Sequence, residues 1–314
     1  MKYFTKQNME EVVSMKDIID SIDETYKLYL NNDFYMPTRT QVTNQQNTLV
    51  LMPCFTKKYI ATKLITVFPE NSKKNLSSIN GTVTLNCNLS GINKAILDGT
   101  YLTGVRTGAI GGNAVRHLAK QNVKTLAVIG AGTQGFYQTL AACEERNFEQ
   151  INVYNRTPGE KLTNFIQNLN AALNYKVHIT AVDTPGRAIQ NADVVITATN
   201  SKDPVLPDDK ELLKNKLFIG IGSFQQDMRE FPEALYSNIS RTFVDSTDAL
   251  KESGDLITPL KQGWLASKDV QTMASFIKDP TIDIEDNNES ILFKSTGMAL
   301  FDAVVASNIY EASL

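Results

Sequence analysis

The residues with the clearest chemical meaning form a glycine-rich turn. Residues 128–135 read Val-Ile-Gly-Ala-Gly-Thr-Gln-Gly, and Gly130, Gly132 and Gly135 have the spacing G-x-G-x-x-G. The first glycine of this motif permits a tight turn, the second lets the backbone approach a pyrophosphate, and the third lets a helix pack closely on a strand. A tight turn without a ligand is the alternative. The strand pattern before the motif and the helix pattern after it favour a dinucleotide whose pyrophosphate lies at a helix N-terminus.

The next strand pattern ends at residues that predict the type of dinucleotide. Tyr154 is followed by Asn155, Arg156 and Thr157. NAD-binding proteins usually place an acidic residue here, which binds the ribose 2′-hydroxyl. An amide followed by a guanidinium accepts a 2′-phosphate better, because arginine pairs bidentately with phosphate. We therefore expect NADP(H) to be favoured over NAD(H), with a solvated loop arginine as the alternative.

A single lysine interrupts an apolar strand pattern at residues 59–68. With the period of two that strands follow, Lys63 shares one face with Tyr59, Ala61, Ile65 and Val67. Burial would lower the pKa of Lys63 and make it a proton donor or acceptor near neutral pH. A lysine at the rim whose ammonium reaches solvent is the alternative.

Two arginines stand in sequence contexts that fit anion binding. Arg39 ends Met-Pro-Thr-Arg ahead of a strand pattern, and Arg106 precedes Thr107 and Gly108 in a helix pattern. Each could hold a carboxylate or a phosphate through bidentate hydrogen bonds. Taken alone, each is more often a surface residue.

The elements that would position these residues fall into two groups. The first group has a helix pattern at 14–30 and strand patterns at 48–52, 59–68 and 82–87, and it ends in a helical connector at 99–119. Short apolar runs then alternate with amphipathic helices, which is typical of a parallel sheet with crossover helices. We predict an α/β fold with a mixed α/β substrate-binding and dimerisation domain at 1–118 and a doubly wound Rossmann domain at 119–296. The last helix, within 297–314, should fold back on the first domain.

Composition excludes several classes of function. Lys+Arg is 31 and Asp+Glu is 34, so the net charge of −3 argues against a nucleic-acid surface. The three cysteines, Cys54, Cys87 and Cys143, form no CxxC pair, and with only two histidines no metal site is expected. No run of about 18 apolar residues and no signal-peptide pattern occurs, so we expect no membrane span and a cytoplasmic protein.

The order and spacing of these motifs resemble the ornithine cyclodeaminase/mu-crystallin family along nearly the whole chain. The most specific part is Arg106-Thr107-Gly108-Ala109 joined to the glycine turn. The matching stretches are residues 36–39, 51–53, 63–71, 97–99, 104–109, 130–135, 192–195, 222–230, 244–246, 252–255 and 293–299.

This resemblance implies a homodimer in which a Rossmann domain binds NAD(H) or NADP(H) and the other domain binds an amino acid, a keto acid or a cyclic imine. Arg39, Met52, Lys63 and Arg106 would line the substrate site, with Lys63 as the catalytic acid or base. The residues that would contact the dinucleotide are Thr107, Gly130, Gly132, Thr133, Gln134, Asn155, Arg156 and Thr157, with Ser295 and Gly297 near the nicotinamide.

The chain departs from the family pattern at two places. Ornithine cyclodeaminases carry an aspartate two residues after the first glycine of a Gly-Gly pair, where this chain has Phe224 after Gly222 and Ser223, and Asp227 comes three positions later. Glycines at 108, 111 and 112 replace the usual alanine and serine, which adds flexibility or permits a close backbone approach.

We therefore predict an oxidoreductase that transfers a hydride at the α-carbon of an amino acid or its imine. The alternatives are an ornithine cyclodeaminase, which Phe224 disfavours, and a ligand-binding protein like mu-crystallin. The positioned Lys63 favours catalysis over storage. The substrate itself stays open.

Overall fold

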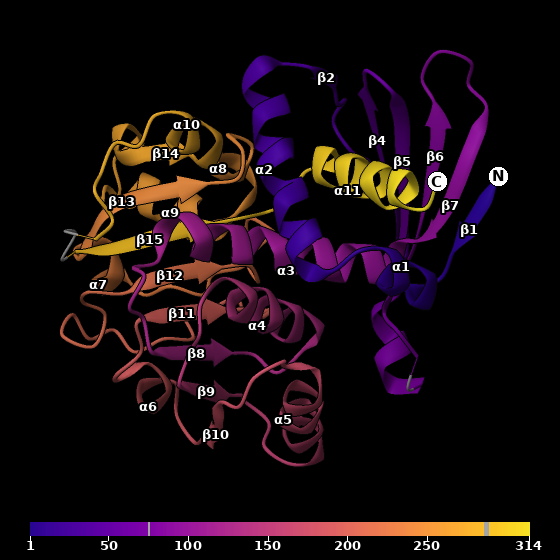
Figure 1. Ribbon diagram of the computed structural model, residues 1–314. Coiled ribbons are helices and arrows are strands. Elements are labelled where there is room, and N and C mark those ends of the chain that lie inside the picture. Colours follow the sequence, from indigo (N-terminus) through magenta and orange to yellow (C-terminus); the bar gives the residue numbers. More distant parts are fainter. Residues whose placement is uncertain (75, 286–288) are drawn as a thin grey trace. The chain divides into compact units, whose positions relative to one another are not determined.

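The structure, a computed structural model, describes residues 1–74, 76–285 and 289–314. Its internal contacts divide the chain into two units (Figure 1). The first unit comprises Met1–Arg106 and Met298–Leu314, and the second comprises Thr107–Gly297. The end of the chain thus belongs to the same unit as its beginning.

The boundary between the units lies inside helix α3 (Gly99–Leu118), whereas the sequence placed it at the end of this helix. Residues 107–118 group with the second unit because they lie directly against helix α4 (Thr133–Glu145). A Cβ atom at Gly108 would be 2.6 Å from the carbonyl oxygen of Tyr137, and one at Gly111 would collide with the side chain of Gln138. Gly108 and Gly111 therefore serve close packing rather than flexibility.

The first unit is built on one mixed sheet with the strand order β1-β7-β6-β5-β4-β2, to which β3 is added beside β4. Only β1 pairs in parallel with its neighbour among the described strands; the other pairs are antiparallel. The strands are β1 (Lys2–Phe4), β2 (Phe34–Tyr35), β3 (Thr40–Asn44), β4 (Asn47–Thr56), β5 (Tyr59–Val67), β6 (Ile79–Cys87) and β7 (Asn93–Asp98). The predicted strands lie within or overlap β4, β5 and β6.

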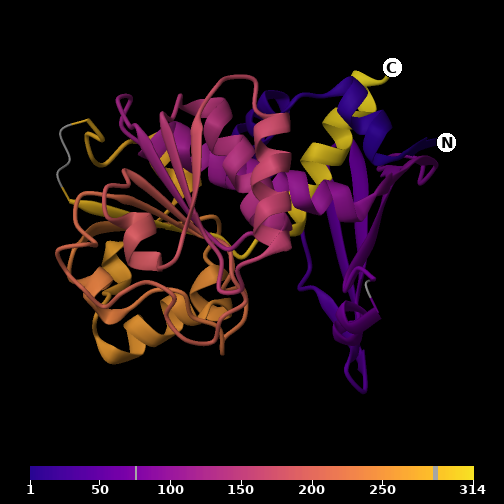
Figure 2. The ribbon, with the colours of Figure 1, turned by 90° about the horizontal axis from the view of Figure 1, so that it is seen from below.

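Helices cover one face of this sheet. They are α1 (Lys6–Val12), α2 (Met15–Asn31) and α11 (Ala299–Ala312), with a short 3-10 helix η1 (Pro69–Lys74) after β5. A capping box between Ser14 and Asp17 begins α2, as the sequence predicted, and Asn32 ends it in the left-handed conformation. Figure 2 shows α11 running along the strands of the sheet. It contacts β4, β5 and β6 on one side and α2 on the other, which is why it is apolar on nearly every side.

The second unit is built on a parallel sheet with the order β10-β9-β8-β11-β12-β15-β13-β14. The direction of strand progression reverses between β8 and β11, which makes the carboxyl ends of these two strands the expected ligand crevice. The strands are β8 (Thr125–Ile129), β9 (Gln150–Tyr154), β10 (His178–Val182), β11 (Val194–Thr197), β12 (Leu217–Gly220), β13 (Ile239–Val244), β14 (Val270–Thr272) and β15 (Ser290–Lys294). The predicted α/β fold with a doubly wound parallel sheet is confirmed.

Crossover helices complete the second unit and cover its sheet. Besides α4 they are α5 (Glu160–Ala172), α6 (Pro185–Ile189), α7 (Glu233–Tyr236), α8 (Ala249–Glu252), α9 (Gly254–Gln262), the 3-10 helix η2 (Ser267–Asp269) and α10 (Met273–Lys278). Each residue of β11 and β12 is buried, because a parallel sheet covered on both faces leaves neither side to solvent.

Candidate active site

A buried ion-paired group occupies the helix-covered face of the sheet in the first unit. Lys63 on β5 donates a hydrogen bond from Nζ to Oδ2 of Asp302 at 2.6 Å. Arg106 on α3 donates from Nε to the other oxygen, Oδ1, at 3.0 Å. The side chain of Lys63 is 1% exposed and that of Asp302 is also 1% exposed. One carboxylate therefore joins the two cations that the sequence singled out.

Burial changes the proton equilibrium of Lys63. It lowers the pKa of this lysine to about 8, because a desolvated ammonium is disfavoured. The charge of Asp302 opposes this effect, while the positive charges of Arg106 and Arg39 add to it. Lys63 can therefore exchange a proton near neutral pH, as the alternating strand pattern predicted. The alternative of a rim lysine that reaches solvent is wrong.

Asp302 is the residue of this group that sequence reasoning missed. Burial by itself would raise the pKa of Asp302, but Arg106 and Lys63 outweigh burial and hold the pKa below its usual range. The carboxylate is therefore ionised at neutral pH. One sequence signal was present: Asp302 is the only charged residue in the otherwise apolar run 298–306. A lone acid on a helix that is apolar on nearly every side needs a buried cationic partner.

Arg106 has hydrogen-bonding capacity left after pairing with Asp302. Among the described residues, its guanidinium donates to Asp302 through Nε, and no acceptor contacts its two terminal nitrogens. These nitrogens are the pair that binds a carboxylate in bidentate geometry. Arg39 is half-buried and close enough for its charge to act on Lys63. Met52 is buried on β4 directly opposite Lys63 in the strand register.

In the second unit, the glycine turn has the form that the motif predicts. Gly130 has a φ of 113°, and a Cβ at Gly135 would collide with the carbonyl oxygen of Gly130. Gly132 is the N-cap of α4 and offers no side-chain acceptor to the first turn of that helix. A Cβ at Gly132 would meet no atom within 4 Å. The space beside Gly132 at the N-terminus of α4 is therefore open, and open space at a helix N-terminus suits an anion.

Two neighbouring segments complete the picture of this turn. The side-chain oxygen of Asn155 accepts from the amide of Ala131 at 3.1 Å, and its nitrogen donates to the carbonyl of Thr157 at 2.7 Å. Asn155 thus ties the end of β9 to the glycine turn. Arg156 is exposed next to it. Thr133 is exposed in the first turn of α4, with Gln134 half-buried after it.

On the α3 side of the turn, Thr107 is buried. Its carbonyl accepts a hydrogen bond from Nε2 of Gln138 on α4 at 2.6 Å. This bond fastens the residue that follows Arg106 to the helix that begins at the glycine turn.

A second network fixes Ser295 and Gly297 after β15. The buried carboxylate of Asp245 accepts from Oγ of Ser295 at 2.6 Å and from the amides of Thr296 and Gly297 at 3.1 and 2.7 Å. Gly297 has a φ of 75°, which a side chain would strain. Asp245 therefore shapes the segment that the resemblance places near the nicotinamide, a role that the sequence alone did not reveal.

Asp227 lies on the surface of the second unit. It forms an ion pair with Lys202 at 2.7 Å, and its side chain is 58% exposed. This pairing holds the pKa of the Asp227 carboxyl below its usual range. Phe224, at the position where cyclodeaminases carry the aspartate, is 47% exposed.

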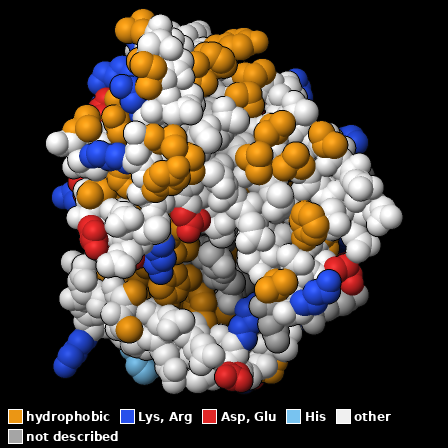
Figure 3. Space-filling view, turned by 90° about the vertical axis from the view of Figure 1, so that its right-hand side faces the viewer, with side chains coloured by type: hydrophobic (Ala, Val, Ile, Leu, Met, Phe, Trp, Pro, Cys, Tyr) orange, Lys and Arg blue, Asp and Glu red, His pale blue; other side chains and the backbone are white. Residues whose placement is uncertain are grey.

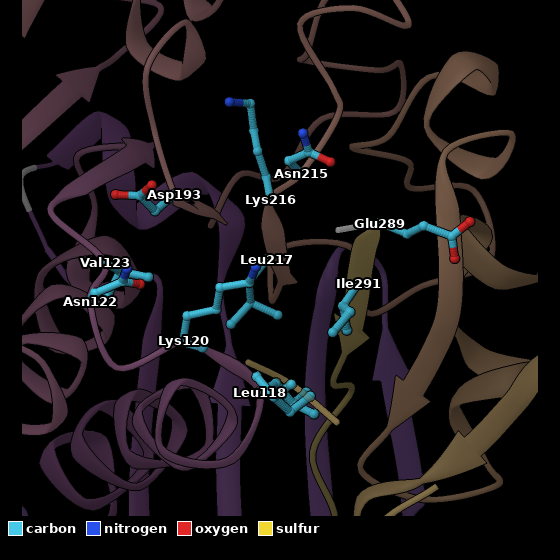
Figure 4. Close-up of a pocket in the computed structure, with 12 residues that line it drawn as sticks. Leu118, Lys120, Asn122, Val123, Asp193, Asn215, Lys216, Leu217, Glu289 and Ile291 are labelled. Atoms are coloured by element: carbon cyan, nitrogen blue, oxygen red, sulfur yellow. The ribbon is translucent and has the colours of Figure 1, made fainter. Parts of the chain in front are cut away.

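A small pocket of about 160 Å³ lies at the amino ends of strands of the parallel sheet (Figure 4), whereas the glycine turn follows the carboxyl end of β8. Its walls include Lys120, Asp193, Lys216 and Glu289, near the amino ends of four strands. Lys216 donates to a backbone carbonyl, and Asp193 accepts from two backbone amides. Because it lies at the amino ends of these strands, this pocket is separate from the expected ligand crevice at their carboxyl ends. The described residues contain no cluster of potential metal ligands. Nor do they contain a helix long and apolar enough to cross a membrane.

Comparison with known proteins agrees with this geometry. A sequence model of the ornithine cyclodeaminase/mu-crystallin family matches residues 2–314. The chain belongs to this family. A Delta(1)-pyrroline-2-carboxylate reductase of Bacillus cereus is 33% identical over 320 residues, which cover 100% of this chain and 97% of that protein. An alanine dehydrogenase of Archaeoglobus fulgidus is 26% identical and covers 99% of this chain and 94% of its own length.

A solved structure extends the family likeness to three dimensions. The Delta(1)-pyrroline-2-carboxylate reductase of Thermococcus litoralis, in complex with NADH and L-proline, has a TM-score of 0.91 and 30% identity. The match covers 100% of this chain and 97% of that protein.

Proposed function

We propose that this protein is an NAD(P)-dependent reductase of a cyclic imino acid of the Delta(1)-pyrroline-2-carboxylate type. Its family relatives establish the broader class, an NAD(P)-dependent oxidoreductase acting on an amino acid, a 2-keto acid or a cyclic imine. The observation that carries the finer proposal is the buried Lys63 beside Arg106, whose terminal nitrogens have no protein acceptor among the described residues. A proton donor next to a carboxylate clamp fits a substrate whose carboxylate is attached to the C=N carbon.

The residues of the first unit supply binding and proton transfer. Arg106, helped by the charge of Arg39, binds the substrate carboxylate and so places the imine nitrogen within reach of Lys63. Lys63 donates a proton to that nitrogen, and solvent later reprotonates the lysine. Asp302 keeps enough of Lys63 in its ammonium form for this step. The nicotinamide, when bound, supplies the hydride that the C=N carbon accepts, so the product is an amine with one new C–H and one new N–H bond.

The second unit is proposed to hold the dinucleotide, with NADP(H) favoured over NAD(H). The amides at the start of α4 bind the pyrophosphate. Arg156 is exposed beside Asn155, whose neutral amide stands where NAD-binding proteins usually carry an acidic residue. Ser295 and Gly297, fixed by Asp245, lie at the nicotinamide end.

A homodimer is proposed because the second face of the sheet in the first unit carries exposed apolar side chains. Side chains alternate along β5, so Leu64 points away from the helices that cover Lys63, and it is 39% exposed. Strand register places Val42 and Tyr35 on the same outer face. Figure 3 views the protein from the side on which β1, β6 and β7 lie in Figure 1. It shows groups of hydrophobic side chains in its upper and central parts. We propose that a second copy of the chain covers this face. Light scattering on the wild type and on Leu64→Asp tests this, with a monomeric wild type as the contrary result.

Cyclodeamination of ornithine is disfavoured by the surface ion pair of Asp227 with Lys202. A single experiment separates the reactions. The purified protein is mixed with Delta(1)-pyrroline-2-carboxylate, or with L-ornithine, and nicotinamide absorbance is followed with NADPH, NADH and NAD+. We expect net oxidation of the reduced cofactor with the imine and no ammonia from ornithine. Ammonia and proline formed from ornithine without net cofactor change would refute the proposal, as would inertness toward all imines and keto acids.

A further inference from the structure

Glu230 is a fully buried carboxylate in the second unit for which the mechanism above has no role. Its Oε1 accepts from the amide and the hydroxyl of Thr199 at 2.7 and 2.8 Å. Its Oε2 accepts from the amides of Gly222 and Ser223 at 2.8 and 3.2 Å. Four donors thus converge on one side chain that is 0% exposed. A buried carboxylate with this many hydrogen bonds fixes the positions of the chain segments that donate to it.

The attached segments follow two neighbouring strands of the parallel sheet. Thr199 comes two residues after β11, and Gly222 comes two residues after β12. The segment after β11 also packs on the glycine turn, since a Cβ at Gly130 would lie 2.7 Å from the carbonyl oxygen of Ala198 and 3.2 Å from Cγ2 of Thr199. Thr199 therefore forms one wall of the crevice at the point where the strand order reverses.

Two further buried charges belong to this cluster: Asp255, which accepts from the backbone of Glu230, and Lys294, which lies beside Asp255. Oδ1 of Asp255 accepts from the amides of Glu230 and Phe231 at 2.7 and 3.1 Å. Nζ of Lys294 lies 3.6 Å from Oδ2 of Asp255, and both side chains are 0% exposed. Lys294 is the last residue of β15. The cluster thus links the carboxyl end of β15 to the ends of β11 and β12.

We infer that Glu230 is a positioning residue of the dinucleotide site. Its side chain holds Thr199, which forms one wall of the crevice, against the glycine turn. This inference rests on the proposed function. The adenosine half of the dinucleotide would lie toward β9, where Asn155 and Arg156 are, on the other side of β8 from β11. Loss of Glu230 should therefore affect the pyrophosphate and nicotinamide half and spare the adenosine half.

The test is a calorimetric titration of the full-length protein with NADPH and with adenosine 2′,5′-bisphosphate. For Glu230→Gln we expect the Kd of NADPH to rise roughly tenfold or more, because an amide nitrogen would face donors where a carboxylate accepted them. The Kd of the bisphosphate should stay within about twofold of wild type. The matched control is Glu233→Gln, which removes an exposed carboxylate three residues further on and should leave both constants unchanged.

A second pair of variants covers the case in which Glu230→Gln fails to fold. Thr199→Val keeps the shape of the side chain and removes one of the four donors, whereas Thr199→Ser keeps the hydroxyl. The valine variant should bind NADPH several-fold more weakly than the serine variant, with equal affinity for the bisphosphate.

Three outcomes would count against this role. Unchanged NADPH affinity in folded Glu230→Gln would overturn it, as would equal affinity of the two Thr199 variants. Equal weakening of both ligands would show general structural support rather than positioning. A wild-type protein that binds no dinucleotide would instead refute the proposed function.

Discussion

Replacing Asp302 with asparagine should change the pH dependence of catalysis. Asp302 accepts from Lys63 at 2.6 Å and is the negative charge that opposes the loss of its proton. Without that charge, the cations Arg106 and Arg39 act on the ammonium alone, so the pKa of Lys63 falls. An opposite charge at this distance typically changes a pKa by about one to three pH units. From the value of about 8 in the intact site, the pKa in Asp302→Asn should fall to roughly 6.

Imine reduction requires the protonated form of Lys63, so a lower pKa of this lysine reduces the rate at neutral pH. At about pH 7.5, roughly three quarters of Lys63 carries its proton when the pKa is about 8, and about 3% when the pKa is about 6. The kcat/KM for imine reduction should therefore fall roughly 25-fold at this pH and recover as the pH is lowered toward about 5.5. An enzyme damaged by unfolding would not recover in this way.

The assay is a pH profile of kcat/KM for wild type and Asp302→Asn, with dinucleotide affinity measured in parallel. Glu311→Gln is the matched control, since it removes a carboxylate from the same helix that pairs with the exposed Lys58. Its profile should coincide with wild type. If folded Asp302→Asn keeps the wild-type pH profile, Asp302 does not set the proton state of Lys63 and the reasoning fails.

Four further variants, at three positions, test the remaining parts of the site. Lys63→Met should fold, bind dinucleotide normally and lose a factor of about 10²–10⁴ in kcat. Lys63→Arg should be equally slow, because a guanidinium keeps its proton near neutral pH, and near-wild-type turnover by either variant would remove Lys63 from the mechanism. Arg156→Ala should weaken NADPH about tenfold or more and leave NADH nearly unchanged in fluorescence titrations, whereas tighter binding of NADH than NADPH by wild type would contradict the cofactor preference. Gly132→Val should keep the circular dichroism spectrum of wild type, because a Cβ at this position meets no other atom within 4 Å. It should nevertheless abolish dinucleotide binding, and normal affinity would mean that the turn binds no pyrophosphate.

Local pattern was enough to predict the features that depend on neighbouring residues. The spacing of Gly130, Gly132 and Gly135 predicts the turn because part of what the turn requires is local: Gly130 has a positive φ, and a Cβ at Gly135 would collide with the carbonyl oxygen of Gly130. The alternation along residues 59–67 predicts the side of β5 that Lys63 faces, because successive side chains of a strand point to opposite faces. The sequence context singled out Arg39 and the family resemblance added Met52, and the structure places Met52 opposite Lys63 and Arg39 close enough for its charge to act on that lysine.

Features that depend on distant residues needed the tertiary structure. Asp302 lies 239 positions from Lys63, and a pattern of apolar residues shows that a charge is buried without showing which partner it meets. Strand β15 comes last in the chain but lies between β12 and β13, an order that no strand's own residues encode. The same holds for Glu230, whose four donors come from segments after two different strands. A sequence pattern reports what a residue requires, such as burial, pairing or freedom of φ, whereas only the folded chain decides which other residue meets that requirement.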